Sequence, residues 1–563
     1  MKALTAAEMW EVDRLTTERF GVPSLQLMEA AGKSVTEVFL EQYGHKNPHA
    51  PRFVAVLCGK GNNGGDGFVT ARYLKEEAER VHVYLFAQPD QLRGDAAKNF
   101  ERWRAEGGGT TVLQSEAEWK KAWGEACAAD VIVDALLGTG VHGAATGLIA
   151  QAIEDVNRLS RNATAPRPGW IVAVDTPSGL PSDGAATEGP VVRAHWTITF
   201  TAPKLGQLIG PNAGCCGQLV VRGIGSPEAL VEEIGKGTAR WADPGEFAGL
   251  PLVRAAEAHK GSFGHVLVVA GSLGKSGAAA MAGYAALRAG AGLVTVATPD
   301  VVLPSVAEAH PEYMTEPLLS TETGTAAKGN FLETPPLPNP SVEHAREARD
   351  KITAPIKFPF ERIQEGKTVL AVGPGLGMHP ETQSFIRSVV RATDRPVILD
   401  ADGLNAFVGH TGEFRERNSK HLVITPHPGE MARLLGVSIE QIQKDRVQAA
   451  IDSARNWNVF VVLKGFHTVI VSPSGKVFVN TTGNPALAKG GSGDVLTGLL
   501  AALLAQFGTE DAWRVIALGV YLHGRAADVL GEQSEASGIL AGELAQAIPY
   551  ARQKLLQELQ ERG

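Results

Sequence analysis

The chain has 563 residues, far more than the roughly 150 of an average domain, so we predict at least two domains. Its formal net charge of -8 argues against a protein that coats nucleic acid, and it has no run of about 18 apolar residues that would predict a membrane span. The four cysteines form no CxxC pair, so we expect a protein of the reducing cytoplasm without structural zinc.

Helices are predicted at the start of the chain. Thr5 and Glu8 have the spacing of a capping box, which predicts that a helix begins there. Residues 24–40 place Met28, Ala31 and Val35 at helical spacing and predict a second amphipathic helix.

Short apolar runs then alternate with helical stretches. Strands are predicted at 53–58, 81–86, 131–136, 170–174, 196–200 and 218–221, and helices between them at 68–78 and 148–159. This alternation is typical of a doubly wound, mostly parallel sheet with helices on both faces.

Polar, glycine-containing segments follow three of these strands, namely GKGNNGGDG at 59–67, DALLGTGVHG at 134–143 and DTPSG at 175–179. Carboxyl ends of parallel strands share one edge of a sheet, so we expect the three segments to form one binding site, although each alone could be only a tight turn. Their oxygen-rich side chains suit a hard cation. The first segment has the G-x-G-x-x-G spacing but no acidic ribose ligand after it, which argues against a simple dehydrogenase.

Four motifs of this half resemble the NAD(P)H-hydrate epimerase family: LMEAAG at 27–32, GNNGGDG at 61–67, DALLGTG at 134–140 and VDTPSGL at 174–180. The resemblance implies a Rossmann-like domain and contacts to the hydrated nucleotide from Asn62, Asn63, Gly64, Gly65, Asp66, Gly138, Thr139, Gly140, Val141, His142, Gly143, Ala144 and Asp175. It also implies a potassium ion held by Asn63, Asp134 and Ser178. Asp134 is the candidate for proton transfer, although an Asp that binds a cation is poorly suited to be a strong base.

The domain boundaries follow from composition. We predict a first domain, the epimerase-like half, at 1–225, a linker without strong strands at 226–258 and a second domain at 259–558. Strands of the second half are predicted at 266–270, 293–297, 369–372, 397–399, 422–424, 459–463 and 469–471, with a hairpin partner that ends at Asn480. The proline-rich, charged stretch 322–367 is predicted to be a surface insertion, with a recognition segment as the alternative.

Polar segments again follow the strands, at 271–277, 373–377, 400–405, 425–430 and 464–468. In addition, NPALAKGGSGDVLTGLL at 484–500 is a glycine-rich turn that leads into a helix near Asp494. Such a helix N-terminus attracts phosphate, whereas Asp494 would repel it. We therefore interpret Asp494 as a base that takes a proton from an attacking hydroxyl, with a simple N-cap as the alternative.

This half resembles the ribokinase-like superfamily and, within it, the ADP- or ATP-dependent NAD(P)H-hydrate dehydratases. The motifs are KGSFGHVLVVAGS, GAGLVTVATP, VGPGLG, LDADGLN, ITPHPGE, LKG and KGGSGDVLTG, in the order of the family. The resemblance implies an α/β/α sandwich and Mg²⁺ with ADP or ATP. It implies nucleotide contacts from Lys464, Gly465, Phe466, His467, Thr468 and Gly493, and hydrate contacts from Ala278, Gly375, His427 and Asp494.

Together the halves indicate an enzyme that repairs NADH hydrate and NADPH hydrate. The first half would interconvert the R and S epimers, and the second would dehydrate the S form at the expense of ADP, giving AMP and phosphate, or of ATP. Two alternatives are a small-molecule kinase with a non-catalytic N-terminal binding domain and a scaffold in RNA metabolism. We expect a cytoplasmic homo-oligomer with no nucleic-acid or membrane partner.

Overall fold

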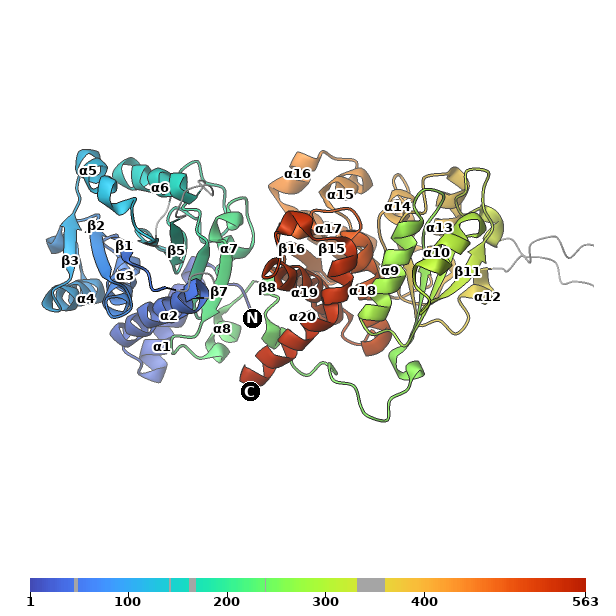
Figure 1. Ribbon diagram of the computed structural model, residues 1–563, viewed down its shortest axis with the longest axis horizontal. Coiled ribbons are helices and arrows are strands. Elements are labelled where there is room, and N and C mark those ends of the chain that lie inside the picture. Colours follow the sequence, from blue (N-terminus) through green and yellow to red (C-terminus); the bar gives the residue numbers. More distant parts are fainter. Residues whose placement is uncertain (45–48, 141–142, 161–168, 238, 332–359, 563) are drawn as a thin grey trace, which may run out of the picture. The chain divides into compact units, whose positions relative to one another are not determined.

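The computed structural model describes residues 1–44, 49–140, 143–160, 169–237, 239–331 and 360–562. The chain divides into two compact units, Met1–Trp241 and Ala242–Gly563, each built on its own sheet (Figure 1). The predicted fold class, two α/β domains, is confirmed. No helix in the described ranges is long and apolar enough to cross a membrane.

The first unit contains a seven-stranded parallel sheet with the order β3-β2-β1-β4-β5-β6-β7. Its strands are β1 (Phe53–Cys58), β2 (Arg80–Leu85), β3 (Gly109–Val112), β4 (Val131–Ala135), β5 (Trp170–Val174), β6 (Trp196–Phe200) and β7 (Gln218–Arg222), and β8 (Ala239–Trp241) ends the unit. The strand order reverses between β1 and β4, and ligands of open parallel sheets bind at such a point.

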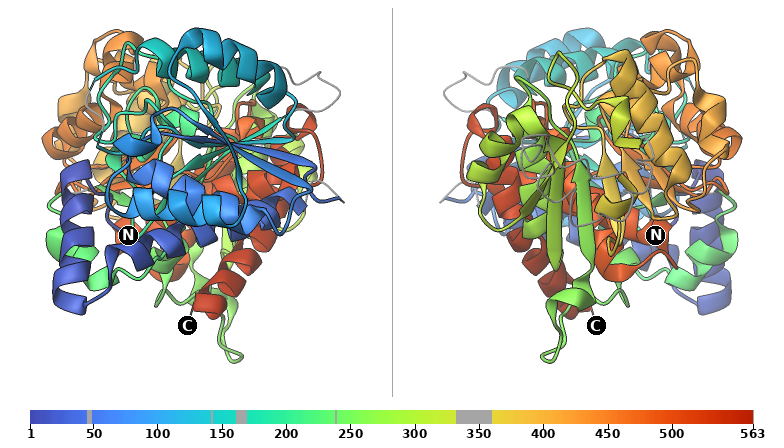
Figure 2. Two further views of the ribbon diagram at one scale, coloured as in Figure 1. Left: turned by 90° about the vertical axis from the view of Figure 1, so that its left-hand side faces the viewer. Right: turned by 90° about the vertical axis from the view of Figure 1, so that its right-hand side faces the viewer.

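Helices cover both faces of this sheet because its strands are apolar on both sides. Val54 and Val56 of β1 pack in one core cluster with α2, α3 and α4, whereas Ala55 and Leu57 pack in the other with α5 and α6 (Figure 2). The helices are α1 (Ala6–Phe20), α2 (Ser24–Gly44), α3 (Asn62–Leu74), α4 (Gly94–Ala105), α5 (Glu116–Ala126), α6 (Gly147–Ser160), α7 (Leu205–Leu208) and α8 (Glu228–Ile234).

The predicted capping box is present at the start of α1, where the Thr5 side chain accepts the backbone N–H of Glu8 and the Glu8 carboxylate accepts that of Thr5. The helix predicted at 68–78 begins earlier and ends earlier, because α3 spans Asn62–Leu74 and so starts inside the glycine-containing segment 59–67. The glycines of this segment allow α3 to pack closely against the end of β1. A Cβ at Gly64 would lie 2.0 Å from the Gly59 carbonyl oxygen, and one at Gly67 would lie 2.8 Å from Cys58 Sγ.

The sequence-based predictions did not include β3, α4, α5, α7, α8 or β8 of this unit. β3 is a short edge strand of Gly, two Thr and Val without the apolar run of an inner strand. α8 and β8 lie in the predicted linker. The buried residues of α8, Leu230 and Val231, are flanked by glutamates, so the sequence shows no clear apolar pattern there.

The second unit contains a mixed sheet in which β9 to β17 follow the order β11-β10-β9-β12-β13-β14-β15-β16-β17. Strands β9 to β15 are parallel, and β16 and β17 add an antiparallel hairpin, as predicted. The strands are β9 (His265–Val269), β10 (Leu293–Pro299), β11 (Met314–Leu318), β12 (Val369–Val372), β13 (Val397–Leu399), β14 (Leu422–Ile424), β15 (Phe460–Leu463), β16 (Thr468–Val471) and β17 (Val477–Asn480).

The core of this unit is centred on α18, which is buried along most of its length and packs against α9, α19, β9, β12 and β13. On the other side of the sheet, α17 contacts β15 and β16. The helices are α9 (Ser276–Arg288), α10 (Leu303–Ala309), α12 (Phe360–Ile363), α13 (Pro380–Ala392), α14 (Asp402–Asn405), α15 (Pro428–Leu435), α16 (Ile439–Lys444), α17 (Arg446–Trp457), α18 (Ser492–Phe507), α19 (Ala512–Gly531) and α20 (Ala541–Arg562).

The predicted insertion at 322–367 lies largely outside the described residues, since 332–359 are not described. Its two ends belong to the body of the unit. Ala326, Phe360 and Ile363 are buried, and the Phe360 ring contacts that of Phe385 in α13.

The contact between α9 and α18 gives a stability prediction. A Cβ at Gly498 of α18 would lie 2.1 Å from the Ala282 carbonyl oxygen of α9. Gly498→Ala therefore forces the two helices apart, and we expect it to lower the free energy of unfolding by about 1–3 kcal/mol in urea denaturation. The control is Gly542→Ala in α20, where a Cβ meets nothing within 4 Å and alanine favours the helix. Equal destabilisation by both substitutions would contradict the packing argument.

Candidate active sites

A cavity of about 990 Å³ opens at the carboxyl ends of β1, β4 and β5 in the first unit. Residues from the start of α3 and from the segments that follow β4 and β5 contribute to its lining. Among the predicted site residues, the lining contains Asn62, Asn63, Asp66, Gly138, Thr139, Gly140 and Asp175. The three predicted segments thus converge at the point where the strand order reverses.

The other predicted substrate residues of this half are not in the described lining of the cavity. Gly64 and Gly65 are buried behind the first turn of α3, where a Cβ at Gly65 would lie 2.7 Å from Met28 Sδ. Gly143 has a φ of +95°, and Ala144 lies against Gly189. Val141 and His142 lie outside the described residues.

A hydrogen-bond network joins the three predicted potassium ligands. Ser178 Oγ donates to Asp134 Oδ1 at 2.6 Å and accepts the Leu137 N–H at 2.8 Å, while Asn63 Nδ2 donates to the Leu137 carbonyl at 2.9 Å. Asn63 Oδ1 is buried and has no hydrogen-bond partner. A buried amide oxygen beside a carboxylate and a hydroxyl is the donor set that a hard cation takes, so these residues fit such an ion.

Asp134 lies behind the described lining of the cavity, fully buried and bound by Ser178 Oγ and by the N–H groups of Ser178 and Leu136. Burial raises its pKa to about 6, although these three donors lower it. The position agrees better with the cation ligand than with the proton-transfer role predicted for the same residue.

Two residues that the sequence analysis did not single out line the cavity beside Asp175. Lys204 Nζ donates to Asp175 Oδ1 and, at 2.7 Å, to Thr199 Oγ1. Asp13 of α1 has a buried Oδ1 without a hydrogen-bond partner. Its signal in the sequence is a carboxylate among the residues 9, 12, 13 and 16 that share the buried face of α1.

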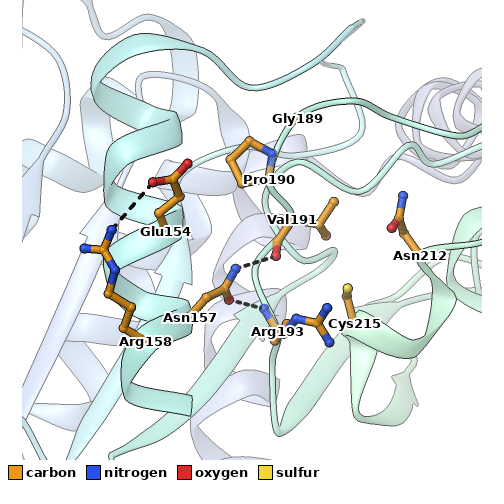
Figure 3. A pocket seen from close by; sticks show the side chains of 9 residues that line it. All are labelled: Glu154, Asn157, Arg158, Gly189, Pro190, Val191, Arg193, Asn212 and Cys215. Atoms are coloured by element: carbon orange, nitrogen blue, oxygen red, sulfur yellow. Dashed lines mark hydrogen bonds and ion pairs between the residues drawn. The ribbon is translucent and has the colours of Figure 1, made fainter. Parts of the chain in front are cut away.

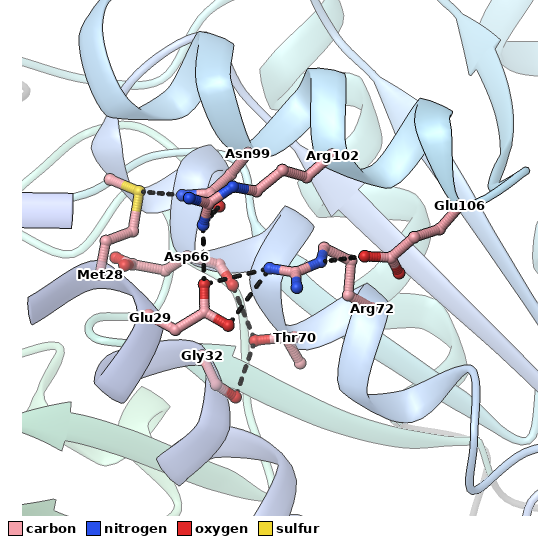
Figure 4. Close-up of polar contacts among 9 residues, drawn as sticks. All are labelled: Met28, Glu29, Gly32, Asp66, Thr70, Arg72, Asn99, Arg102 and Glu106. Atoms are coloured by element: carbon pink, nitrogen blue, oxygen red, sulfur yellow. Dashed lines mark hydrogen bonds and ion pairs between the residues drawn. The ribbon is translucent and has the colours of Figure 1, made fainter. Parts of the chain in front are cut away.

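Ion pairs fix α3 behind the cavity (Figure 4). Glu29 of α2 pairs with Arg72 of α3 at 3.1 Å and with Arg102 of α4 at 3.3 Å, and Thr70 Oγ1 donates to the Asp66 carbonyl at 2.8 Å. Glu29 therefore ties the C-terminal part of α3 to α2 and links α2 to α4, while the Thr70 hydrogen bond to Asp66 lies within α3 itself.

A smaller hollow of about 370 Å³ lies between α6 and the segment around Val191 (Figure 3). Asn157 braces it by donating to the Val191 carbonyl at 2.8 Å and accepting the Arg193 N–H at 2.7 Å. It contains none of the predicted site residues, so we assign the ligand site of this unit to the larger cavity.

In the second unit, the polar segments after β13 and β15 meet at the N-terminus of α18. Lys464 Nζ pairs with Asp400 Oδ1 at 2.8 Å, and Thr497 Oγ1 of α18 donates to Asp400 Oδ2 at 2.9 Å. A Cβ at Gly493 would lie 3.4 Å from Asp400 Oδ2 and 3.5 Å from Lys464 Nζ. The predicted nucleotide residues Lys464 and Gly493 are thus neighbours.

Asp494 occupies the first turn of α18 and is half-buried beside this ion pair. Burial and the nearby carboxylates of Asp400 and Asp402 together raise its pKa to about 7, although Lys464 opposes them. Because the ideal pKa of a general base lies near the working pH, Asp494 is suited to accept a proton at neutrality.

The rest of the predicted nucleotide segment forms a turn whose carbonyl groups accept hydrogen bonds from Arg446 of α17. Arg446 donates to the carbonyl groups of Leu463, Phe466 and His467 at 2.5–3.3 Å. Phe466 is 60% exposed and stacks on His467 with ring centroids 4.1 Å apart. Gly465 has a φ of +149°, and Thr468 Oγ1 donates to its carbonyl at 3.2 Å. An exposed aromatic ring beside an anion-binding turn suits a nucleotide base.

Of the residues predicted to contact the hydrate, Gly375 and Ala278 lie next to each other. A Cβ at Gly375, whose φ is +64°, would lie 3.0 Å from that of Ala278. His427 is the N-cap of α15, where its Nδ1 accepts the Gly429 N–H at 3.0 Å, and its side chain is 51% exposed. It therefore stabilises the helix and keeps an open ring face.

Backbone strain is concentrated at these sites. Five described residues other than glycine have a positive φ, and three of them are Asp175, His467 and Ala401, the last of which lies between Asp400 and Asp402. Such conformations cost about 1–3 kcal/mol each and persist where function requires them.

Comparisons with known proteins cover the whole chain. Residues 266–550 match the family model described as NAD(P)H-hydrate dehydratase, and residues 24–206 match the model described as YjeF-related protein N-terminus. The bifunctional NAD(P)H-hydrate repair enzyme Nnr of Moorella thermoacetica is 40% identical over 100% of this chain and 98% of its own length. The enzyme of the same name from Escherichia coli K12 is 34% identical over 94% of this chain and 90% of its own length.

Among solved structures, an ADP/ATP-dependent NAD(P)H-hydrate dehydratase from Bacillus subtilis, co-crystallised with ATP and Mg²⁺, is 31% identical. The match covers 56% of this chain and 98% of that chain with a TM-score of 0.45.

The ion pair between Lys464 and Asp400 gives a second stability prediction. The Asp400 side chain is 2% exposed, so Lys464→Met leaves a buried carboxylate without its cation. We expect the free energy of unfolding to fall by about 3 kcal/mol. The double variant Lys464→Met/Asp400→Asn removes the charge as well and should recover most of the loss. If the double variant is as unstable as the single one, the effect does not come from the unpaired charge.

Proposed function

The chain belongs to the family of bifunctional NAD(P)H-hydrate repair enzymes, and on that premise we propose which of its residues carry out the two reactions. It is both an NAD(P)H-hydrate epimerase and an ADP/ATP-dependent NAD(P)H-hydrate dehydratase. Membership along the full length sets aside a kinase with a non-catalytic N-terminal domain.

The observation that carries the assignment of the dehydratase site is the position of Asp494 at the N-terminus of α18, beside Lys464. Free N–H groups and the helix dipole favour the phosphates of ADP or ATP there, and Lys464 adds a positive charge. Asp494 takes the proton from the ring hydroxyl of the S hydrate as the hydroxyl oxygen attacks the terminal phosphate. With ADP as donor, the nucleotide product is AMP.

Release of phosphate completes this reaction. The carbon–oxygen bond breaks with its electron pair on the phosphate, and the lone pair of the ring nitrogen forms a carbon–nitrogen double bond. Loss of a proton from the adjacent ring carbon then restores NAD(P)H. Mg²⁺ would neutralise phosphate charge, and Asp402, which raises the pKa of Asp494 and is less buried than Asp400, is the carboxylate that would face it.

We assign epimerisation to the cavity of the first unit, because it gathers seven predicted substrate residues where the strand order reverses. Asn63, Asp134 and Ser178 would hold K⁺ at its edge, which is supported by the unpartnered Asn63 Oδ1. The ion would fix the segment after β4 and add positive charge near the ligand. A cytoplasmic homo-oligomer remains a prediction that light scattering and cell fractionation would test.

Recovery of NADH tests both assignments. The full-length protein is added to mixed R and S NADH hydrate with Mg²⁺, and NADH is followed by its near-ultraviolet absorbance with ADP, ATP or no nucleotide. We expect nucleotide-dependent recovery of both epimers, the R fraction faster than it epimerises spontaneously, and slower recovery of R when K⁺ is replaced by tetramethylammonium. Recovery of the S form alone would contradict the epimerase assignment, and the donor that gives the faster rate names the phosphate source.

The raised pKa of Asp494 predicts a pH profile. A base with a pKa of about 7 is protonated and inactive below it, so kcat/KM for dehydration of the S hydrate should fall on the acid side of pH 7. Asp494→Asn should lower kcat by about 10²–10⁴-fold and remove this limb, while calorimetry still detects nucleotide binding. The control is Glu510→Gln, an exposed residue beyond α18, which should match the wild type. Near-normal turnover of Asp494→Asn would refute the assignment of the base.

A further inference from the structure

Two carboxylates enter the cavity of the first unit from different helices, and neither belongs to the cation network. Asp13 comes from the middle of α1 and Asp66 from the start of α3. Asp13 lines the cavity, and its buried Oδ1 has no hydrogen-bond partner in the structure. Asp175, in contrast, is already engaged, because Lys204 and Thr199 both donate to its Oδ1.

Epimerisation at the hydrated carbon requires two proton transfers. The hydroxyl group must leave as water, which takes up one proton, while the lone pair of the ring nitrogen forms a carbon–nitrogen double bond. Water must then add to the opposite face of this iminium carbon and lose one proton. The reaction therefore needs one protonated acid and one ionised base, and it needs no oxidant or further reactant.

We propose that Asp66 and Asp13 are this acid and base, with Asp13 of α1 contacting the water or hydroxyl of the ring carbon; the proposal rests on the epimerase function proposed for this cavity. Asp66 donates its proton to the leaving hydroxyl group. Asp13 accepts a proton from the attacking water. The reverse reaction uses the same groups in exchanged roles. Lys204 neutralises Asp175 and so limits the negative charge that the two carboxylates experience.

The electrostatics of the cavity support two different protonation states. Burial raises the pKa of Asp13 to about 6, which Lys204 opposes, so Asp13 is mostly ionised at neutrality. Burial raises the pKa of Asp66 well above its usual range, and the charges of Asp175 and Asp13 raise it too while Lys204 opposes them, which favours the protonated form of Asp66. Neighbouring carboxyl groups whose pKa values are pushed apart are typical of acid and base pairs. The other charged groups that line the cavity are Arg14, Glu18, Lys60 and Asp95.

The test uses Asp13→Asn in the full-length protein. The R and S hydrates are separated by chromatography, and conversion of R to S is measured without nucleotide, so that dehydration does not interfere. We expect kcat/KM for epimerisation to fall about 100-fold or more. Dehydration of the pure S hydrate by the same preparation should be unchanged. The control is Glu37→Gln, which removes an exposed carboxylate of α2 that is not in the described cavity lining and should epimerise normally.

Two readouts separate proton transfer from a merely structural role. The wild-type rate should rise with pH through about 6 as Asp13 ionises, and Asp13→Glu should keep this limb, whereas Asp13→Asn should lack it. Because the pKa of Asp13 is higher in the folded than in the unfolded protein, the free energy of unfolding falls as pH rises toward about 6 and Asp13 ionises. Above pH 6, Asp13→Asn should therefore be at least as stable as the wild type.

The outcomes are distinguishable. If the wild-type protein does not convert R to S faster than the spontaneous reaction, the epimerase assignment of the cavity fails, and this proposal fails with it. If the wild type is active and Asp13→Asn stays within about threefold of it, only the role of Asp13 is overturned.

Discussion

Parallel pairing of strands is the constraint on which both sites depend. In a parallel sheet the carboxyl ends of all strands lie at the same edge. The polar segments that follow the strands therefore come together at this edge, even when they are far apart in the sequence. In the first unit this gathers the segments that follow β1, β4 and β5. In the second unit it brings the residues after β13 and β15 to the N-terminus of α18.

Both sites combine a lysine-paired carboxylate with a second carboxylate whose pKa is raised. Lys204 binds Asp175 beside Asp13 in the first, and Lys464 binds Asp400 beside Asp494 in the second. The lysine offsets the charge of the carboxylate that it pairs with. Burial raises the pKa of the second carboxylate toward physiological pH, so this group can exchange a proton there. The same electrostatic arrangement thus serves two different reactions on two different sheets.

Close backbone packing makes room for these groups. Gly64 and Gly67 let α3 start directly behind β1, which places Asn63 and Asp66 in its first turn. In the second unit, Gly498 lets α18 approach α9 and keeps the helix buried beneath its charged N-terminus. The glycines of the motifs therefore act mainly on packing, and side chains next to them carry the chemistry.

The sequence by itself determined the two α/β domains, most strand positions, the capping box of α1 and the convergence of the polar segments, because these depend on local periodicity and on a general property of parallel sheets. It also indicated Asp494, since a carboxylate in a glycine-rich helix start is a local signal. Only the tertiary structure decided that Asp13 and Lys204 join Asp175, that α3 begins within the glycine motif, and that Asp134 lies behind the cavity. The positions of Asp13 and Lys204 depend on how the helix of residues 6–20 and the turn after β6 pack against strands that are far away in the sequence. No local sequence pattern encodes these contacts.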